Sequence, residues 1–263
     1  MNAIILAAGE GKRLHPLTKN CPKGLVPLFG RSLLERQIEV FRQCNISDIS
    51  IVTGYLGNMI NFSNITYFQN PKYDKTNMVE TLFCAREKLN DSTIVSYSDI
   101  IFEKLILQKL IDSKENISVV VDTEWYDYWK KRFSNPLDDA ESLVLKDGYI
   151  ANIGQKTQDL SEIQGQYIGL MKFQNEGIDM LKNFYDRSKE NARTGINPLN
   201  SNLPFEKSYL TDLIQGLITN GHKIKAIPIK NGWLELDSFS DFQLYEKLYE
   251  ANNLEQFIKI KAN

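Results

Sequence analysis

Two glycines and two basic residues near the N-terminus could hold the phosphates of a nucleotide. Residues 3–8 form a continuous apolar run, typical of a strand buried on both faces, and Gly9 and Gly11 follow it directly. Open α/β sheets bind ligands at the carboxyl ends of their strands, and glycines let backbone N–H groups approach phosphate oxygens. Arg13 could grip a phosphate through paired hydrogen bonds, and Lys23 could act as a point charge.

This glycine loop does not match the two best-known phosphate-binding motifs. The dinucleotide fingerprint would need a third glycine where Leu14 stands, and a P-loop would need serine or threonine after Lys12. A Gly-x-Gly pair alone more often marks a turn than a ligand site. The nearby cations Arg13 and Lys23 favour phosphate binding over a simple turn.

Asp99 and Asp237 are candidate ligands for a divalent metal ion. Asp99 follows the strand-like run 93–97 and is expected at the same sheet edge as the glycine loop, and Asp237 follows another apolar run. Nucleotidyl transfer needs cations on the phosphates, and carboxylates hold Mg²⁺. Two alternatives remain open. Asp99 could be a turn residue, and Asp237 or Ser238 could be the N-cap of the following helix, with Asp241 completing the cap.

Segment 122–132 combines aromatic, acidic and basic side chains in the order DTEWYDYWKKR. Asp122, Trp125 and Trp129 could hold an ammonium group through ionic and cation–π contacts, and the basic run could hold a phosphate or carboxylate. A zwitterionic phospho-compound would use both kinds of contact. The alternative is a lid or a packed surface loop, and packing is the more common role of any single aromatic in such a cluster.

The order of expected elements predicts an α/β, Rossmann-like fold with a doubly wound, mostly parallel sheet and an elaborated second half. Strands are expected at 3–8, 49–52, 65–68, 93–97, 117–121, 167–173, 223–229 and 233–236, with a hairpin at 143–153. Helices are expected at 32–42, 77–88, 105–112, 178–189 and 209–219, and beyond 238. We predict a single domain over 1–263, with a nucleotide-binding part (1–121), an acceptor-binding part (122–237) and C-terminal helices (238–263).

Composition excludes several function classes. The chain has 263 residues and a formal net charge of −2, which argues against a nucleic-acid partner. Three well-separated cysteines and two histidines make a disulfide framework, a zinc site or a histidine-based triad improbable. The N-terminal apolar run is too short to cross a membrane and is followed by charge rather than by a cleavage site. A cytoplasmic protein without a membrane partner is expected.

The stretch 4–40 resembles the signature of the nucleotidyltransferase family that includes the sugar-1-phosphate nucleotidylyltransferases. The family pattern is LAAGxGxRLxPLT, then PK, then a proline before an LLxxQIExL helix. This sequence supplies these parts at 6–18, 22–23, Pro27 and 33–39. The resemblance implies the fold of the nucleotide-diphospho-sugar transferases.

The resemblance also implies roles for individual residues. It places Arg13 on the leaving pyrophosphate and Lys23 on the α-phosphate and the incoming phosphate, and it marks Asp99 and Asp237 as the pair that holds Mg²⁺. The residues expected around the nucleotide are Leu6, Ala7, Ala8, Gly9, Glu10, Gly11, Lys12, Arg13, Lys23, Asn77 and Ser98.

Within this family the chain is similar to the short phosphocholine and phosphonate cytidylyltransferases. The matching features are Gly54-Tyr55, Asn77-Met78, Ser98-Asp99, Glu162 and the run 165–169. The similarity implies CTP as one substrate and phosphocholine, 2-aminoethylphosphonate or phosphoglutamine as the acceptor, for the decoration of surface glycans. Glu162 and Tyr167 join Asp122, Trp125 and Trp129 as expected acceptor-binding residues, and a homodimer is possible.

Two other functions remain open from the sequence. A sugar-1-phosphate nucleotidylyltransferase would share the loop and the metal pair, but its usual Gly-Asp-Asn is replaced here by Ser98-Asp99-Ile100. A non-catalytic nucleotide-binding protein would be expected to have a degenerate loop, whereas Arg13, Lys23 and both aspartates are present.

Overall fold

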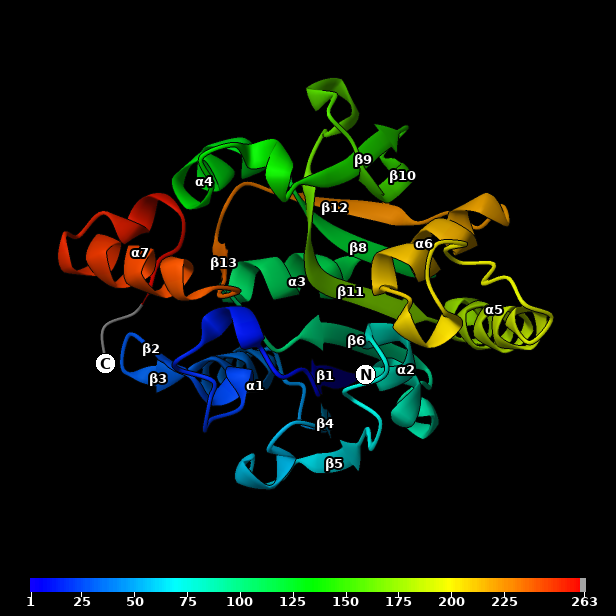
Figure 1. Ribbon diagram of the computed structural model, residues 1–263, viewed down its shortest axis with the longest axis horizontal. Helices are drawn as coiled ribbons and strands as arrows, with labels where there is room; N and C mark the ends of the chain where they lie inside the picture. The colour runs from blue at the N-terminus through cyan, green and yellow to red at the C-terminus, as the bar shows by residue number, and fades with distance from the viewer. Residues whose placement is uncertain (261–263) are drawn as a thin grey trace.

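One nine-stranded sheet forms the centre of the molecule (Figure 1), and the computed structural model describes residues 1–260. In spatial order the strands are β5 (Thr66–Gln69), β4 (Ile49–Thr53), β1 (Asn2–Ala7), β6 (Ser92–Tyr97), β11 (Gln166–Gln174), β8 (Ile117–Asp122), β12 (Lys225–Ile229), β10 (Tyr149–Lys156) and β9 (Glu141–Lys146). Strands β11 and β10 run antiparallel to both of their neighbours, so the other seven share one direction. The predicted, mostly parallel α/β fold is confirmed.

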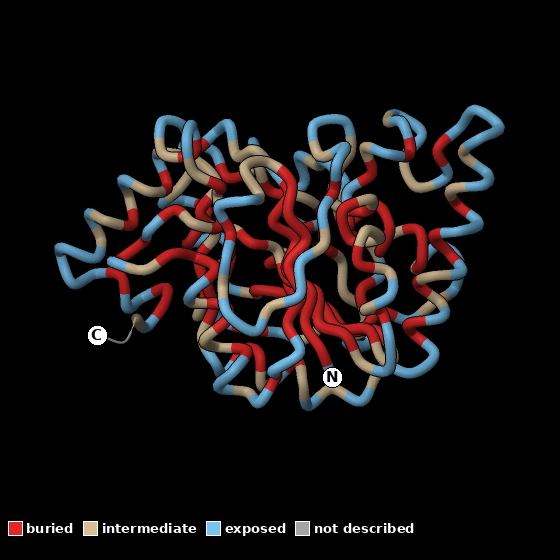
Figure 2. Tube along the Cα trace, turned by 90° about the horizontal axis from the view of Figure 1, so that it is seen from below, coloured by how far each residue is buried: buried red, intermediate tan, exposed pale blue. Residues whose placement is uncertain are grey.

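Strand β1 lies at the heart of this sheet, as its unbroken apolar sequence predicts. Ala3, Ile5 and Ala7 belong to one hydrophobic core and Ile4 and Leu6 to another, because alternate residues of a strand face opposite sides of a sheet. β1 pairs in parallel with β4 on one side and β6 on the other. Figure 2 shows these buried strands at the centre of the molecule, with exposed turns around them.

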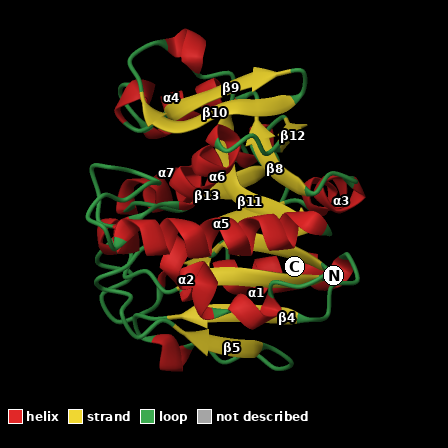
Figure 3. Ribbon diagram, turned by 90° about the vertical axis from the view of Figure 1, so that its right-hand side faces the viewer, coloured by secondary structure: helices red, strands yellow, loops and turns green. Residues whose placement is uncertain are grey.

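Helices cover both faces of the sheet. The face with Ala3 is covered by α1 (Leu33–Gln43), α3 (Lys104–Asp112), α4 (Trp125–Arg132) and α7 (Phe239–Glu250). The opposite face is covered by α2 (Met78–Cys84), α5 (Glu176–Ala192) and α6 (Leu210–Thr219), and Figure 3 shows α5 lying across it. Within residues 1–260, no helix combines the length and the apolar character needed to span a membrane.

Several local signals act as the sequence predicts. The Ser32 hydroxyl accepts a hydrogen bond from the Glu35 N–H, and the Glu35 carboxylate accepts one from the Ser32 N–H at 2.7 Å, which is a capping box at the start of α1. The hairpin β9–β10 turns at Asp147 and Gly148, whose φ angles are 53° and 78°. Two successive positive φ angles are typical of a tight hairpin turn.

Three segments differ from the sequence-based expectation. Helix α2 ends at Cys84 instead of Lys88, and a 3₁₀ turn covers Arg86–Lys88. The expected loop or lid after β8 is the helix α4, because Trp125, Tyr128 and Trp129 have the spacing of one buried helix face. Beyond α7 the structure has a 3₁₀ turn at Leu254–Gln256, and residues 261–263 of the expected C-terminal helices lie outside the described part of the chain.

A two-stranded ribbon that the sequence did not predict joins distant parts of the chain. Strand β7 (Ile100–Phe102) directly follows Asp99, and it pairs antiparallel with β13 (Trp233–Glu235), which ends two residues before Asp237. The register places Ile100 opposite Glu235, and the Leu236 N–H donates to the Asp99 carbonyl at 2.8 Å. This ribbon brings the two candidate metal ligands together. A second small hairpin joins β2 (Pro27–Leu28) and β3 (Arg31–Ser32).

Candidate active site

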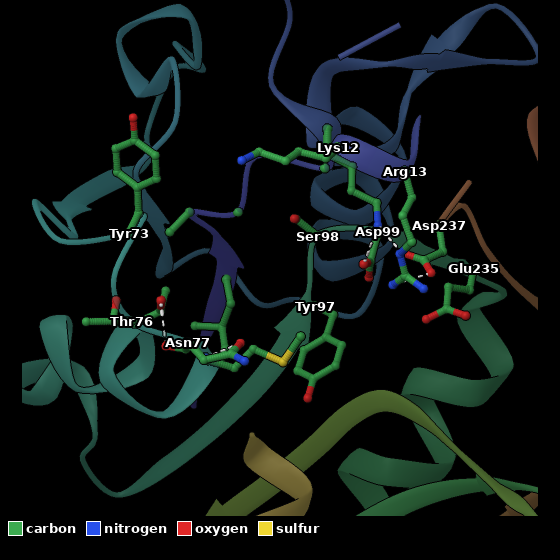
Figure 4. A pocket seen from close by; sticks show the side chains of 17 residues that line it. Lys12, Arg13, Tyr73, Thr76, Asn77, Tyr97, Ser98, Asp99, Glu235 and Asp237 are labelled. Atoms are coloured by element: carbon green, nitrogen blue, oxygen red, sulfur yellow. Dashed lines mark hydrogen bonds and ion pairs between the residues drawn. The ribbon is translucent and has the colours of Figure 1, made fainter. Parts of the chain in front are cut away.

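A pocket of about 370 Å³ lies at the carboxyl end of β1 (Figure 4). Its walls come from the loop after β1, the start of α2, the end of β6 and the end of β13. The predicted site residues that line it are Leu6, Ala8, Gly9, Gly11, Lys12, Arg13, Lys23, Asn77, Ser98, Asp99 and Asp237. Ala7 and Glu10, which the sequence also assigned to the nucleotide, are not among the lining residues; Ala7 instead packs in the core below.

The loop after β1 is held in shape by close packing around Gly11. Its φ angle is +63°, and a Cβ there would lie 3.2 Å from the Lys23 Cβ, so a larger residue would be strained and crowded. The buried Thr18 hydroxyl donates to the Gly11 carbonyl at 2.7 Å. Leu14, which occupies the position of the missing third glycine, is fully buried. The loop is therefore anchored by an apolar side chain as well as by backbone geometry.

The β7–β13 ribbon places Asp99 and Asp237 around one ammonium group. The Lys23 Nζ lies 2.9 Å from the Asp99 Oδ2 and 2.9 Å from the Asp237 Oδ1. The side chains of Lys23, Asp99 and Asp237 are only 11%, 16% and 14% exposed. Arg13 forms an ion pair with Asp237, and its Nη2 lies 2.5 Å from the Asp237 Oδ2. Side chains that the sequence assigned separately to phosphates and to metal thus form one ion-pair cluster.

The charges in this cluster shift the pKa values of Lys23 and Asp237. Burial alone would lower the pKa of Lys23, but the adjacent carboxylates of Asp99 and Asp237 outweigh it and hold that pKa above its usual range. Burial would raise the pKa of Asp237, but the charges of Lys23 and Arg13 hold it below its usual value. At neutral pH the Lys23 ammonium and the Asp237 carboxylate are therefore both charged.

The N-cap alternative for Asp237 is resolved by the start of α7. The N-cap is Ser238, whose hydroxyl accepts from the Asp241 N–H, and Asp241 completes the capping box. The carboxylate of Asp237 contacts Lys23 and Arg13 instead. Asp237 is therefore free to serve the pocket.

The donor set fits a magnesium ion. Mg²⁺ is commonly held by one or two carboxylates together with substrate phosphates and water. Within residues 1–260 there is no group of three or more His, Cys, Asp or Glu side chains with metal-binding geometry, so Asp99 and Asp237 would act as a pair. The Asp99 Oδ1 is buried and has no hydrogen-bond partner among the described residues, which leaves an acceptor atom available.

Three of the predicted acceptor-binding residues are buried and do not line the pocket, which corrects the expectation for segment 122–132. Asp122 is fully buried, and its Oδ2 accepts from the Trp233 Nε1 at 2.8 Å. Trp125 and Trp129 are 4% and 3% exposed, and their rings pack edge to face with centroids 5.8 Å apart. The packing alternative from the sequence describes both tryptophans.

The two other predicted acceptor residues lie in different settings. Glu162 is exposed and accepts from the Thr157 hydroxyl at 2.6 Å within its own turn, away from the pocket lining. Tyr167 packs its ring edge to face against Tyr97, a pocket residue, with centroids 5.6 Å apart. The hydroxyl of Tyr167 is buried and has no hydrogen-bond partner within the described chain.

Several pocket residues were not selected from the sequence: Tyr73, Thr76, Met78, Thr81, Tyr97 and Glu235. Signals for two of them were present. Tyr97 ends the strand that precedes Asp99, and Glu235, the last residue of β13, stands two residues before Asp237. Tyr73 and Thr76 come from a loop between β5 and α2, where no periodic pattern marks a side chain's direction.

Comparisons with known proteins agree with this geometry. Residues 3–153 match the family described as the MobA-like NTP transferase domain. The CTP:phosphoglutamine cytidylyltransferase of Campylobacter jejuni is 40% identical over 93% of this chain and 98% of its own. The choline-phosphate cytidylyltransferase of Streptococcus pneumoniae is 36% identical over 43% of this chain and 51% of its own.

Solved structures show the same fold at lower identity. The CTP:phosphocholine cytidylyltransferase from Streptococcus pneumoniae aligns with a TM-score of 0.71 at 23% identity, covering 95% of this chain and 98% of that one. The inositol-1-phosphate CTP transferase from T. maritima aligns with a TM-score of 0.69 at 18% identity, covering 98% of each chain. The matched domain covers more than half of the chain, and the glycine loop and the aspartate pair line one pocket. This protein therefore belongs to the MobA-like NTP transferase family of nucleotidyltransferases.

Proposed function

We propose that the protein is a CTP-dependent cytidylyltransferase that transfers CMP to phosphoglutamine or a close analogue and releases pyrophosphate. The observation that carries this proposal is the 40% identity with the phosphoglutamine enzyme over 93% of the chain. Phosphocholine is the competing acceptor, because the choline-phosphate relative matches 43% of the chain at 36% identity. Both acceptors combine a phosphate with a nitrogen-containing organic group.

The chemistry can proceed without a general base. A phosphate oxygen of the acceptor attacks the α-phosphorus of CTP in line, a P–O bond forms, and the bond to the leaving pyrophosphate breaks. The attacking oxygen is already anionic near neutral pH, and no histidine is among the described lining residues of the pocket. Catalysis is then a matter of orientation and charge neutralisation.

The basic residues of the pocket would carry most of that neutralisation. Lys12 and Arg13 line the pocket with largely exposed side chains, which can contact the β- and γ-phosphates. Lys23 is more buried, and its ammonium lies between the carboxylates of Asp99 and Asp237. When nucleotide binds, we expect Lys23 to turn from Asp99 and Asp237 toward the α-phosphate.

The two aspartates would hold a magnesium ion. When bound, Mg²⁺ would neutralise charge on the triphosphate and help to orient it. Asp99 directly precedes β7 and Asp237 lies two residues beyond β13, so their spacing is set by the pairing of these strands and by the hydrogen bond from the Leu236 N–H to the Asp99 carbonyl. Backbone pairing of this kind favours a preorganised site.

The acceptor would enter from the side built by residues 122–237. Tyr97 forms part of the pocket wall, and Tyr167 packs behind it. Aromatic rings can hold a cationic group of the acceptor. A CDP-linked product would be an activated donor of a phospho-group, consistent with a role in the decoration of surface glycans.

A single plate assay tests the proposal. CTP, UTP, ATP and GTP are each combined with phosphoglutamine, phosphocholine, 2-aminoethylphosphonate and glucose-1-phosphate, and pyrophosphate release is measured with Mg²⁺ present. We expect the highest kcat/KM for CTP with phosphoglutamine. A preference for glucose-1-phosphate would replace the proposal with a sugar nucleotidylyltransferase. Nucleotide binding without any pyrophosphate release would favour a non-catalytic role.

A further inference from the structure

A buried arginine links helix α4 to strand β13, which ends two residues before the metal-site aspartate Asp237. Arg132 is the last residue of α4, and its side chain is 1% exposed. Its Nη1 donates to the Glu235 Oε2 at 2.8 Å, and its Nε and Nη2 donate to the two carboxylate oxygens of Asp241 at 2.9 and 3.1 Å. One guanidinium therefore joins α4, β13 and α7, which lie together at one side of the molecule (Figure 1).

Asp241 connects Arg132 to the backbone of the metal site through hydrogen bonds. Its Oδ2 accepts from the Ser238 N–H at 2.9 Å and from the Asp237 N–H at 3.2 Å. The carboxylate held by Arg132 thus fixes the peptide that precedes the Asp237 side chain. Glu235 also lines the pocket, and Figure 4 shows its side chain beside Arg13 and Asp237.

Two tyrosines hold the backbone of Glu235 from both sides. The Tyr128 hydroxyl accepts from the Glu235 N–H at 2.9 Å, and the Tyr245 hydroxyl donates to the Glu235 carbonyl at 2.7 Å. The two hydroxyls are also hydrogen-bonded to each other. Glu235 is therefore hydrogen-bonded at its N–H, its carbonyl and its carboxylate.

Two aromatic residues of segment 122–132, Tyr128 and Trp129, pack against this arginine. Its guanidinium carbon lies 5.4 Å from the ring centroid of Tyr128 and 5.2 Å from that of Trp129. Stacked, hydrogen-bonded guanidinium groups have little freedom to move. A buried ion pair is weak grounds for stability, because an apolar replacement of similar volume often packs as well or better. The specific geometry therefore points to a role in orientation.

We propose that Arg132 is a positioning residue for the divalent-metal site, acting through Asp241 on Asp237 and directly on Glu235. This inference rests on the proposed metal-dependent reaction but not on the identity of the acceptor. It also gives segment 122–132 a function different from the acceptor contact that its composition suggested. Partners that orient metal-binding side chains typically change metal affinity by about 10- to 100-fold when they are removed.

The test is Mn²⁺ binding by electron paramagnetic resonance, with CTP present and no acceptor. We expect Arg132→Met to weaken Mn²⁺ binding by about 10- to 100-fold, and Arg132→Lys to recover part of that loss. In turnover assays, the Mg²⁺ concentration for half-maximal rate should rise by a similar factor, while KM for the acceptor stays within about twofold. A folded Arg132→Met protein with wild-type Mn²⁺ affinity would overturn the proposal.

Lys172→Met is the matched control for the loss of a buried cation. Lys172 is fully buried, donates to the carbonyls of Ile111 and Ser113, and stands opposite Ile94, near the start of β6 and at the other end of that strand from the metal site. Its Mn²⁺ affinity should equal that of the wild type. Equal weakening in Lys172→Met and Arg132→Met would also overturn the proposal, since it would show a general effect of destabilisation.

A milder variant covers the case in which Arg132→Met does not fold. Tyr245→Phe keeps the ring but removes the hydrogen bond to the Glu235 carbonyl, and it should weaken Mn²⁺ binding by about twofold to fivefold, the effect of one hydrogen bond of about 0.5–1 kcal/mol. Unchanged binding in both Tyr245→Phe and Arg132→Lys would refute the positioning role. The metal measurement uses no acceptor, so an incorrect acceptor assignment would leave its result intact. Failure of wild-type protein to bind Mn²⁺ with CTP would refute both proposals.

Discussion

The loop 9–23 and the segment 122–132 both suggested a ligand site, and only the loop lies in the pocket. The loop leaves the sheet at the end of β1, where backbone N–H groups and basic side chains meet an open sheet edge. The aromatic segment folds into α4 and buries Trp125, Tyr128 and Trp129. Glycines after a buried strand indicate a particular backbone conformation at a particular place in the fold. Aromatic composition indicates only that a large apolar area is buried, and it does not predict where.

Both regions nevertheless contact residues of the same pocket, the loop directly and segment 122–132 through Glu235 and Asp241. Lys23 contacts Asp99 and Asp237 directly at 2.9 Å, while Arg132 reaches Asp237 through the carboxylate of Asp241. Substitutions in the loop should therefore affect the chemical step. Substitutions in α4 should affect stability or metal affinity.

The largest effect is expected for Lys23→Ala. Loss of the ammonium that stabilises the phosphates should lower kcat by at least about 10²-fold, comparable to the loss of one oxyanion-stabilising donor. Steady-state pyrophosphate release with saturating CTP and acceptor measures it. Lys19→Ala, an exposed lysine of the same loop, is the control and should turn over normally. Near-normal kcat in Lys23→Ala would show that Lys23 takes no part in the chemical step. The loop and segment 122–132 would then no longer differ in their expected effect on catalysis.

Removing Lys23 should also change the affinity of the nucleotide-free protein for a divalent ion, because its ammonium lies between the two carboxylates of the ion-pair cluster. Without the ammonium, the two carboxylates repel each other and attract a divalent ion more strongly. Mn²⁺ binding to the nucleotide-free protein should tighten in Lys23→Ala relative to the wild type. Weaker binding instead would show that Lys23 supports the metal site rather than occupying its place.

Asp237→Asn should separate metal binding from helix capping. The variant loses one of two anionic metal ligands, so activity at 1 mM-scale Mg²⁺ should fall by about 10²-fold and recover in part at higher Mg²⁺. Ser238→Ala removes the N-cap of α7 and should cost about 1 kcal/mol of stability in urea denaturation without changing the Mg²⁺ requirement. An unaltered Mg²⁺ titration in Asp237→Asn would contradict the metal assignment.

The smallest effect on catalysis is expected for Trp125→Phe. The ring is buried among other aromatics, so the smaller side chain should lower stability by about 1 kcal/mol while KM for the acceptor changes by less than about twofold. Urea denaturation and acceptor titration measure the two quantities. A large rise in acceptor KM at unchanged stability would restore the acceptor-binding interpretation of segment 122–132.

Local sequence signals predicted most of the first half of the fold. The apolar run before Gly9, the capping box at Ser32 and the Asp147-Gly148 turn each depend on residues close together in the chain, and each appears in the structure. The predicted end of α2 at Lys88 and the predicted loop or lid over 125–132 were wrong, because the extent of a helix depends on packing as well as on propensity. The roles assigned to individual pocket residues stay predictions.

The sequence by itself determined where the glycine loop lies, because a buried parallel strand followed by glycines delivers the loop to the carboxyl end of the sheet, where ligands of such folds bind. Only the tertiary structure decided that Asp99 and Asp237 share one ammonium group and that Arg132 supports Asp237 from behind. The pairing of β7 with β13 joins segments far apart in the chain. Such non-local backbone hydrogen bonds leave no periodic mark in either segment.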